Sequence, residues 1–153
     1  MLLSSPFRSV QRVYFDDLDA LNILHNVRFL LFIERARGEL FNALGFHWSD
    51  DLTKNPDKFN VIAEHSIRYL KPVRGEGDIS VELSVPHLGR SSLKLAARVV
   101  SLHGSTCFAE SMTRIVRLDP ETFRPAPWSD RMREALRPLL TEEPPGGAEE
   151  EEE

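Results

Sequence analysis

One long apolar helix is the feature that most limits how this chain can fold. From Asn26 to Leu44, apolar residues recur at spacings of three and four, which predicts a helix with one continuous apolar face. Asn26 is the expected N-cap, and Gly45 the expected C-cap. Further leucine and phenylalanine residues widen the apolar face, so we expect the helix to be buried and to lie against a sheet.

The rest of the chain has the period of β-strands. Residues 7–15 form the first predicted strand, and residues 16–25 form a loop that leads into the helix. After the helix, four segments alternate apolar and polar residues between turn-forming sequences: NVIAEHSIRYL, DISVELSVPHL, SSLKLAARVVSL and TCFAESMTRIVRL. A short last helix over residues 128–140 has Ser129 as its N-cap. Together these elements predict an α+β fold in which a curved antiparallel sheet of about five strands wraps the long helix.

Charge divides the chain into two parts. The 153 residues suffice for one domain with its own core, and the formal net charge is −5. From Glu142 onward there are seven acidic residues and no basic one, which leaves 19 basic and 17 acidic residues in the rest of the chain. We therefore predict a mildly cationic folded domain over residues 1–141 and a disordered acidic tail over residues 142–153.

Several classes of protein are disfavoured by the sequence. No apolar run approaches the roughly 20 residues of a membrane span, and no export signal is recognisable, so we expect a cytoplasmic protein. Cys107 is the single cysteine, which excludes an internal disulfide. The five histidines lack ligand-pair spacing, and no glycine-rich phosphate-binding motif is present. We expect no metal, no cofactor and no nucleic-acid partner.

An acidic turn stands directly before the long helix. It contains Asp16, Asp17 and Asp19, whose charges repel one another. The free amides at a helix N-terminus attract anions and polarised oxygens, so a carboxylate beside them suits chemistry on a carbonyl group. The alternative is that the three aspartates only cap or solvate the turn.

Four motifs in a fixed order carry a resemblance to a known family: VYFDDLDA, FIERAR, IRYLKPVRGEGD and VRLDPETFRP. From Val10 to Leu140 the chain resembles the hotdog-fold acyl-CoA thioesterases of the 4-hydroxybenzoyl-CoA thioesterase family, particularly the branch associated with the Tol-Pal system. The resemblance implies a hotdog fold and an enzyme that hydrolyses an acyl thioester to a free acid and a thiol. The substrate would be an acyl-CoA or an acylated acyl carrier protein, and the acyl group itself is not identified.

The resemblance also implies roles for the residues of the acidic turn. Asp19 is the expected catalytic carboxylate, acting as nucleophile or general base, and the backbone N–H of Asn26 is the expected donor to the carbonyl oxygen. Asp17 would shape the loop. Asn22 stands where the family usually has glycine, and asparagine tolerates a positive φ better than most residues. His25 either hydrogen-bonds the thioester or tunes Asp19, or it has a structural partner only.

Substrate-binding residues are expected elsewhere on the chain. By the resemblance, the turn HLGRSSLK would meet the phosphates of coenzyme A with Arg90, Ser91 and Ser92; otherwise it is an ordinary exposed hairpin turn. Glu34 either pairs with Arg37 or reaches the site of a neighbouring subunit. Glu64 lies on the strand expected beside the helix, where pairing with neighbouring residues would also explain it.

The strand edges predict an oligomer, and the sequence leaves two alternative functions open. We expect a homodimer joined through the edge of a strand such as SSLKLAARVVSL or DISVELSVPHL, with HLGRSSLK of one subunit near the helix start of the other. The resemblance also suggests a homotetramer built from such dimers. The first alternative function is a hotdog enoyl-thioester hydratase or dehydratase, although Leu21 and Ile23 occupy the places of its expected asparagine and proline. The second is a non-catalytic module that binds acyl groups.

Overall fold

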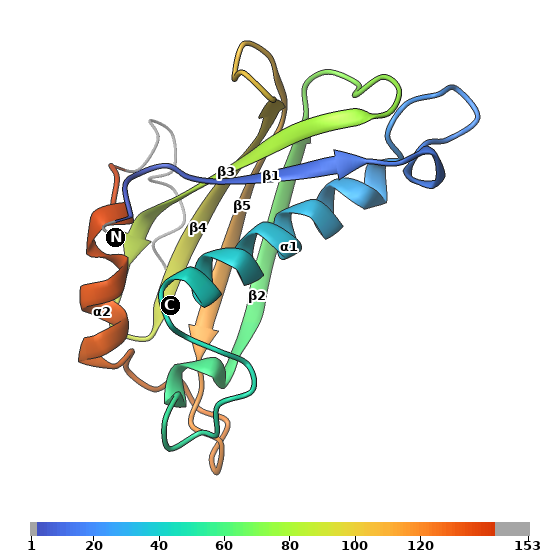
Figure 1. Ribbon diagram of the computed structural model, residues 1–153. Helices are drawn as coiled ribbons and strands as arrows, with labels where there is room; N and C mark the ends of the chain where they lie inside the picture. Colours follow the sequence, from blue (N-terminus) through green and yellow to red (C-terminus); the bar gives the residue numbers. More distant parts are fainter. Residues whose placement is uncertain (1–2, 143–153) are drawn as a thin grey trace.

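The chain folds as one antiparallel sheet with a long helix across one of its faces (Figure 1). The computed structural model describes residues 3–142. Its strands are β1 (Phe7–Val13), β2 (Asn60–Tyr69), β3 (Gly77–Leu88), β4 (Ser92–Ser101) and β5 (Cys107–Arg117), and its helices are α1 (Asn26–Ala43) and α2 (Asp130–Leu136). Three short 3₁₀ turns complete it: η1 (Phe15–Asp17), η2 (Pro56–Lys58) and η3 (Arg137–Leu139). The predicted α+β architecture with five strands is confirmed.

The predicted acidic tail lies almost wholly outside the described residues. Its disorder and the domain boundary at residue 141 therefore stay predictions. Within residues 3–142, no helix is long and apolar enough to cross a membrane.

The ends of α1 follow from local chemistry. His25, rather than Asn26, is the N-cap: its Nδ1 accepts a hydrogen bond from the Val27 N–H at 3.4 Å, so Asn26 becomes the first helical residue. At the other end Gly45 has a φ of +87°, and the N–H of Phe46 reaches back to the carbonyl of Phe41 at 2.9 Å. This is the glycine-dependent C-terminal turn predicted at that position.

One face of α1 supplies the centre of the core. Its fully buried residues are Phe29, Phe32, Ile33, Ala36 and Leu40. They meet the inward-facing residues of the central strands, among them Val81, Leu83, Leu95 and Val99. Burial of each large apolar side chain stabilises the folded state by about 1.5–3 kcal/mol. This contact fixes where the two ends of α1 lie relative to the sheet.

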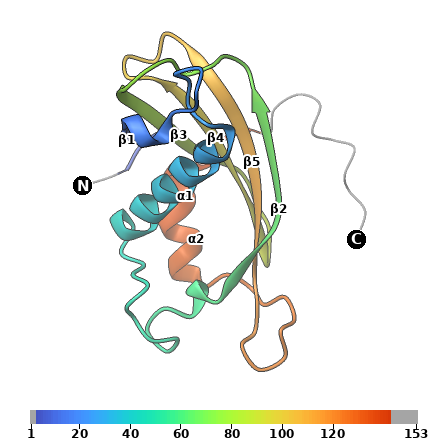
Figure 2. The ribbon, with the colours of Figure 1, turned by 90° about the vertical axis from the view of Figure 1, so that its right-hand side faces the viewer.

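The strand order is β1-β3-β4-β5-β2, so β3 and β4 are interior strands. Leu83 of β3, for example, is paired with Phe7 on one side and Ala97 on the other. The prediction that DISVELSVPHL or SSLKLAARVVSL presents a free edge is therefore wrong, because both segments already have two partners. The free edges belong to β1 and β2, and Figure 2 shows β2 at the margin of the sheet.

The C-terminal segment supports the far end of the sheet. Ser129 caps α2, as predicted, by accepting the Met132 N–H at 3.1 Å. The buried carboxylate of Asp57 accepts hydrogen bonds from the N–H of Ser129 at 2.8 Å and from its hydroxyl at 2.5 Å. The Trp128 N–H donates to the carbonyl of Arg90 at 2.9 Å. The segment around α2 thereby holds the β3–β4 turn in place.

Candidate active site

The loop before α1 is a tight turn centred on Asn22. The N–H of Asn22 donates to the Asp19 carbonyl at 3.0 Å, and the N–H of Asp19 donates to the Ile23 carbonyl at 2.9 Å. Asn22 has a φ of +60°, in the left-handed region that the glycine of the family would occupy. Its carbonyl accepts the Gly75 N–H at 2.9 Å, which joins the loop to the segment before β3. The asparagine therefore preserves the turn, as predicted.

The Asp19 carboxylate is oriented by backbone amides. Its Oδ1 accepts the N–H of Leu21 at 2.8 Å and the N–H of Ile23 at 3.4 Å. Within residues 3–142 no donor lies within hydrogen-bonding distance of Oδ2, and the residue is half-buried. One oxygen is thus fixed to the loop while the other is available to a ligand.

Asp17 joins the loop to the helix. Its buried carboxylate accepts the Tyr14 N–H at 2.8 Å through Oδ2, and its Oδ1 lies 3.6 Å from Nε of Arg28. Its backbone carbonyl accepts the His25 N–H at 3.0 Å. These contacts match the loop-shaping role predicted for Asp17.

The N-terminus of α1 lies at the end of this loop. Asn26, as the first helical residue, has an amide without an acceptor inside the helix, and the helix dipole makes this end electropositive. The Asn26 carbonyl accepts the hydroxyl of Tyr69 at 3.1 Å. His25 has a structural partner through its cap on Val27, which is one of the two alternatives left open by the sequence.

The β3–β4 turn, which carries Arg90 and Ser91 and leads into Ser92, lies at the opposite end of the sheet from the loop before α1, which carries Asp19 (Figure 1). β3 begins beside the Asp19 loop and runs for 12 residues, about 40 Å at ~3.3 Å per residue, before it reaches this turn. The turn is held by the Arg117 N–H, which donates to the Ser91 carbonyl at 2.8 Å. Arg90 is exposed, and none of the carboxylates in residues 3–142 forms an ion pair with it. One chain therefore does not bring Arg90 and Asp19 together.

Glu34 points from the middle of α1 toward β2. Its Oε2 lies 2.5 Å from Nη2 of Arg37, which is the predicted pairing within the helix. Its Oε1 is buried without a hydrogen bond, 3.6 Å from Nε2 of His65. A 2.8 Å hydrogen bond joins Nδ1 of His65 to the hydroxyl of Thr113. The sequence does not predict this contact of Glu34 with the sheet, although the alternation along β2 is a signal for the inward position of His65.

Glu64 does not join this group. Successive side chains of a strand point to opposite faces, and its neighbour His65 faces α1, so Glu64 points to the outer face of the sheet. There it lies 4.0 Å from Arg114, its cross-strand partner on β5. The carboxylate has no contact with the Asp19 loop.

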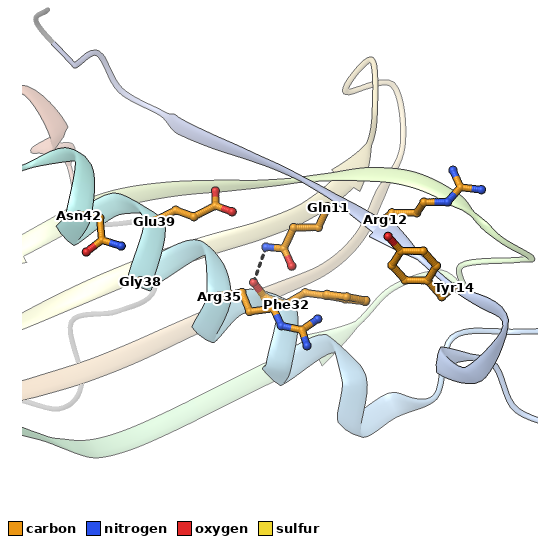
Figure 3. A pocket seen from close by; sticks show the side chains of 8 residues that line it. All are labelled: Gln11, Arg12, Tyr14, Phe32, Arg35, Gly38, Glu39 and Asn42. Carbon is orange, nitrogen blue, oxygen red and sulfur yellow. Dashed lines mark hydrogen bonds between the residues drawn. The ribbon is translucent and has the colours of Figure 1, made fainter. Parts of the chain in front are cut away.

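A groove of about 440 Å³ lies between β1 and α1 (Figure 3). Phe32 and Gly38 line it from the helix, and Gln11 donates to the Phe32 carbonyl at 2.7 Å across it. Asp19 is not among its lining residues. No group of three or more His, Cys, Asp or Glu side chains in the described part of the chain is arranged to hold a metal ion.

The match with a family model decides the classification. The model described as "Thioesterase superfamily" matches residues 21–108. The chain belongs to this superfamily. The predicted thioester hydrolase activity is confirmed at this level, and the hotdog architecture agrees with it. Because the matched thioesterase segment begins two residues after Asp19, it includes Asn26 and Arg90 but not the expected catalytic carboxylate.

Two bacterial thioesterases are similar to this chain over most of their length. The chain is 25% identical to the acyl-CoA thioester hydrolase YbgC of Escherichia coli over 119 residues, which are 78% of this chain and 87% of that protein. It is 22% identical to the acyl-CoA thioesterase YbgC of Haemophilus influenzae over 138 residues, 90% of this chain and 99% of that protein.

Solved structures of thioesterases have the same fold. A Thermus thermophilus thioesterase, complexed with coenzyme A and Zn, is 30% identical; the match covers 86% of this chain and 92% of that chain, with a TM-score of 0.69. A predicted thioesterase from Bacillus stearothermophilus is 20% identical, covering 92% of this chain and 100% of that chain, with a TM-score of 0.77.

The left-handed turn generates a prediction about stability. Replacing Asn22 by Val should lower the free energy of unfolding by about 1–2 kcal/mol, because a β-branched residue is strained at positive φ. Asn22→Gly is the matched control and should be at least as stable as the wild type. Urea denaturation measures both. Equal midpoints for the Val and Gly variants would contradict the conformation assigned to this turn.

Proposed function

We propose that this thioesterase hydrolyses an acyl-CoA to a free acid and coenzyme A, with Asp19 and the amide of Asn26 at the reacting carbonyl. The observation that carries the proposal is the Asp19 carboxylate, with Oδ1 fixed by two backbone amides and Oδ2 unpaired. It stands on the loop that leads directly into the electropositive start of α1. A base or nucleophile and a fixed donor are what acyl transfer to water requires.

Two mechanisms fit this pair of groups. In the first, Oδ2 attacks the thioester carbon, the thiolate leaves, and water hydrolyses the resulting anhydride to regenerate the carboxylate. In the second, the carboxylate removes a proton from the attacking water and returns it to the departing thiolate. In both, the Asn26 N–H donates to the oxygen that becomes negative in the tetrahedral intermediate. His25 supports the donor by capping the same helix start.

The carrier would be held by the β3–β4 turn. Arg90 supplies an exposed guanidinium for a phosphate, and Ser91 and Ser92 supply hydroxyl groups. The names of the curated relatives support acyl-CoA as the substrate, and the Thermus thermophilus thioesterase was solved with coenzyme A. Acyl carrier protein is the alternative carrier. Membership of the Tol-Pal-associated branch and a cytoplasmic location stay predictions.

A second copy of the chain would bring the separated groups together. If the free β2 edges of two copies pair antiparallel, Asn60 of one lies opposite the partner's Tyr69. Asn60 is paired with Arg117, which holds the Arg90 turn, whereas Tyr69 contacts Asn26. The partner's Arg90 would then lie at the same end of the joined sheet as Asp19.

Such a dimer also bears on Glu34 and Glu64. Glu34 points from α1 toward β2, so its buried Oε1 would be close to the joined edges and to the partner's site. Glu64 faces outward and could contribute only from the outer surface of the joined sheet. A homotetramer would be built from two of these dimers.

Asp19→Asn should keep the fold and lower turnover by ~10²-fold or more, because the amide is neither a base nor a nucleophile. Release of thiol from a panel of acyl-CoAs measures the rate. Asp16→Asn, an exposed neighbour, is the matched control and should stay within about twofold of the wild type. Unchanged turnover in Asp19→Asn would remove this residue from the mechanism. Loss of enoyl absorbance without thiol release would instead indicate a hydratase.

Arg90→Ala should raise KM for acyl-CoA more than it lowers kcat, because a phosphate contact remote from the carbonyl contributes equally to ground and transition states. Steady-state kinetics with acyl-CoA tests this. An acyl-pantetheine thioester, which lacks the nucleotide, is the control substrate and should be hydrolysed equally well by both proteins. A lower kcat at unchanged KM would contradict the phosphate-binding role.

At acyl-CoA concentrations well below the KM of Arg90→Ala, mixing Asp19→Asn with Arg90→Ala protein should recover activity above either parent once subunits have exchanged. Random pairing restores both residues in roughly a quarter of the shared sites, because half of the dimers are mixed and each has one intact site. Thiol release before and after exchange measures the recovery. A 17.5 kDa monomer in sedimentation equilibrium, or an oligomer without recovery, would refute the shared site.

A further inference from the structure

Tyr69 connects the free edge of the sheet with the start of α1. It is the last residue of β2, and its hydroxyl donates to the Asn26 carbonyl at 3.1 Å. Its ring meets Phe29 edge-on, with centroids 5.2 Å apart and an interplanar angle of 76°. Phe29 is buried in the core one turn along the same helix. The phenol therefore contacts the first turn of α1 at two points.

The backbone that carries Tyr69 is itself well held. Tyr69 is paired with Ala109 of β5. The next two amides, of Leu70 and Lys71, both donate to the Phe108 carbonyl, at 2.8 and 3.1 Å. The hydroxyl is thus presented from the end of a paired strand, which is a more rigid support than a loop.

The helix start has a second support in Asp17. Its carboxylate contacts Arg28, and its backbone carbonyl accepts the His25 N–H. Those contacts tie the helix to the catalytic loop, whereas Tyr69 ties it to the sheet. Helix ends tend to fray, and the first residue has the fewest hydrogen bonds within the helix. A contact to its carbonyl therefore restricts a residue that the helix itself holds weakly.

We propose that Tyr69 is a positioning residue for the oxyanion donor. By holding the Asn26 carbonyl, it fixes the orientation of the first helical residue and hence the direction of the Asn26 N–H. This inference rests on the proposed function of that amide. A donor to an oxyanion must lie within a few tenths of an ångström of its optimal position, so a small rotation of the first turn weakens it.

The kinetic consequence is specific. The negative charge on the carbonyl oxygen develops in the transition state, so a misdirected amide lowers kcat and leaves KM unchanged. Loss of one hydrogen bond to a positioning group should reduce kcat about fivefold. Tyr69 is 51% exposed, so its replacement by Phe keeps the ring contact and the fold.

The test is Tyr69→Phe in the full chain. We expect kcat for acyl-CoA to fall about fivefold with KM within about twofold of the wild type. Amide hydrogen exchange over residues 28–32, where the amides of α1 begin to have acceptors in the first turn, should become faster, and exchange in the central strands should not change. Tyr14→Phe is the matched control: Tyr14 is 57% exposed and its ring contacts Arg12, so both readouts should equal those of the wild type.

The outcomes separate this inference from the proposed function. A Tyr69→Phe variant with wild-type kcat and wild-type exchange overturns the positioning role, as does an equal fall of kcat in Tyr14→Phe. A higher KM at unchanged kcat also overturns it, since Tyr69 would then bind substrate. If the wild type releases no thiol from acyl-CoA, the proposed function fails, and unchanged exchange in Tyr69→Phe would still refute the contact itself.

Discussion

The packing of α1 across one face of the sheet is the contact on which the rest of the structure depends. Phe32, Ile33 and Leu40 bury completely against the central strands. Each such side chain stabilises the fold by about 1.5–3 kcal/mol, more than a single hydrogen bond at the helix end contributes. The core therefore decides where α1 begins. The polar contacts around Asn26 then adjust a position that apolar burial has already fixed.

Around that start, two short-range features shape the candidate site. Asn22 accepts a left-handed conformation and turns the chain so that Oδ1 of Asp19 meets two amides. Asp17 is buried and uses both carboxylate oxygens in contacts with the loop and the helix, so it is less accessible to a substrate than Asp19. Of the neighbouring carboxylates in this turn, Asp19 is the one with an oriented yet partly unpaired side chain. The two aspartates therefore differ in their availability to a ligand because their hydrogen bonds differ.

In the proposed dimer, the sheet order explains why the site would depend on assembly. β3 carries the Asp19 end and the Arg90 end about 40 Å apart, since 12 extended residues separate them. No rearrangement of side chains closes that distance. An antiparallel pairing of two β2 edges would bring the two groups to the same end, because the two-fold axis places opposite ends of two identical sheets side by side. The proposed link between dimerisation and activity therefore rests on the geometry of the strands. It does not need the interface strand that was predicted from the sequence.

The sequence by itself determined the local features of this protein. The period of apolar residues predicted every strand and the long helix, Gly45 predicted the C-terminal turn of α1, and Ser129 predicted the N-cap of α2, because each depends on neighbours within a few residues. The N-cap of α1 is His25 instead of the predicted Asn26, and the turn at Asn22 was predicted through the family resemblance. The tertiary structure decided the rest. Alternation says which residues share a face but not which strands become neighbours, so the sequence predicts a free edge at β3 or β4, whereas the free edges belong to β1 and β2. The contacts of Tyr69 with Asn26 and of His65 with Glu34 join residues 43 and 31 positions apart, and only the folding of β2 beside α1 brings them together.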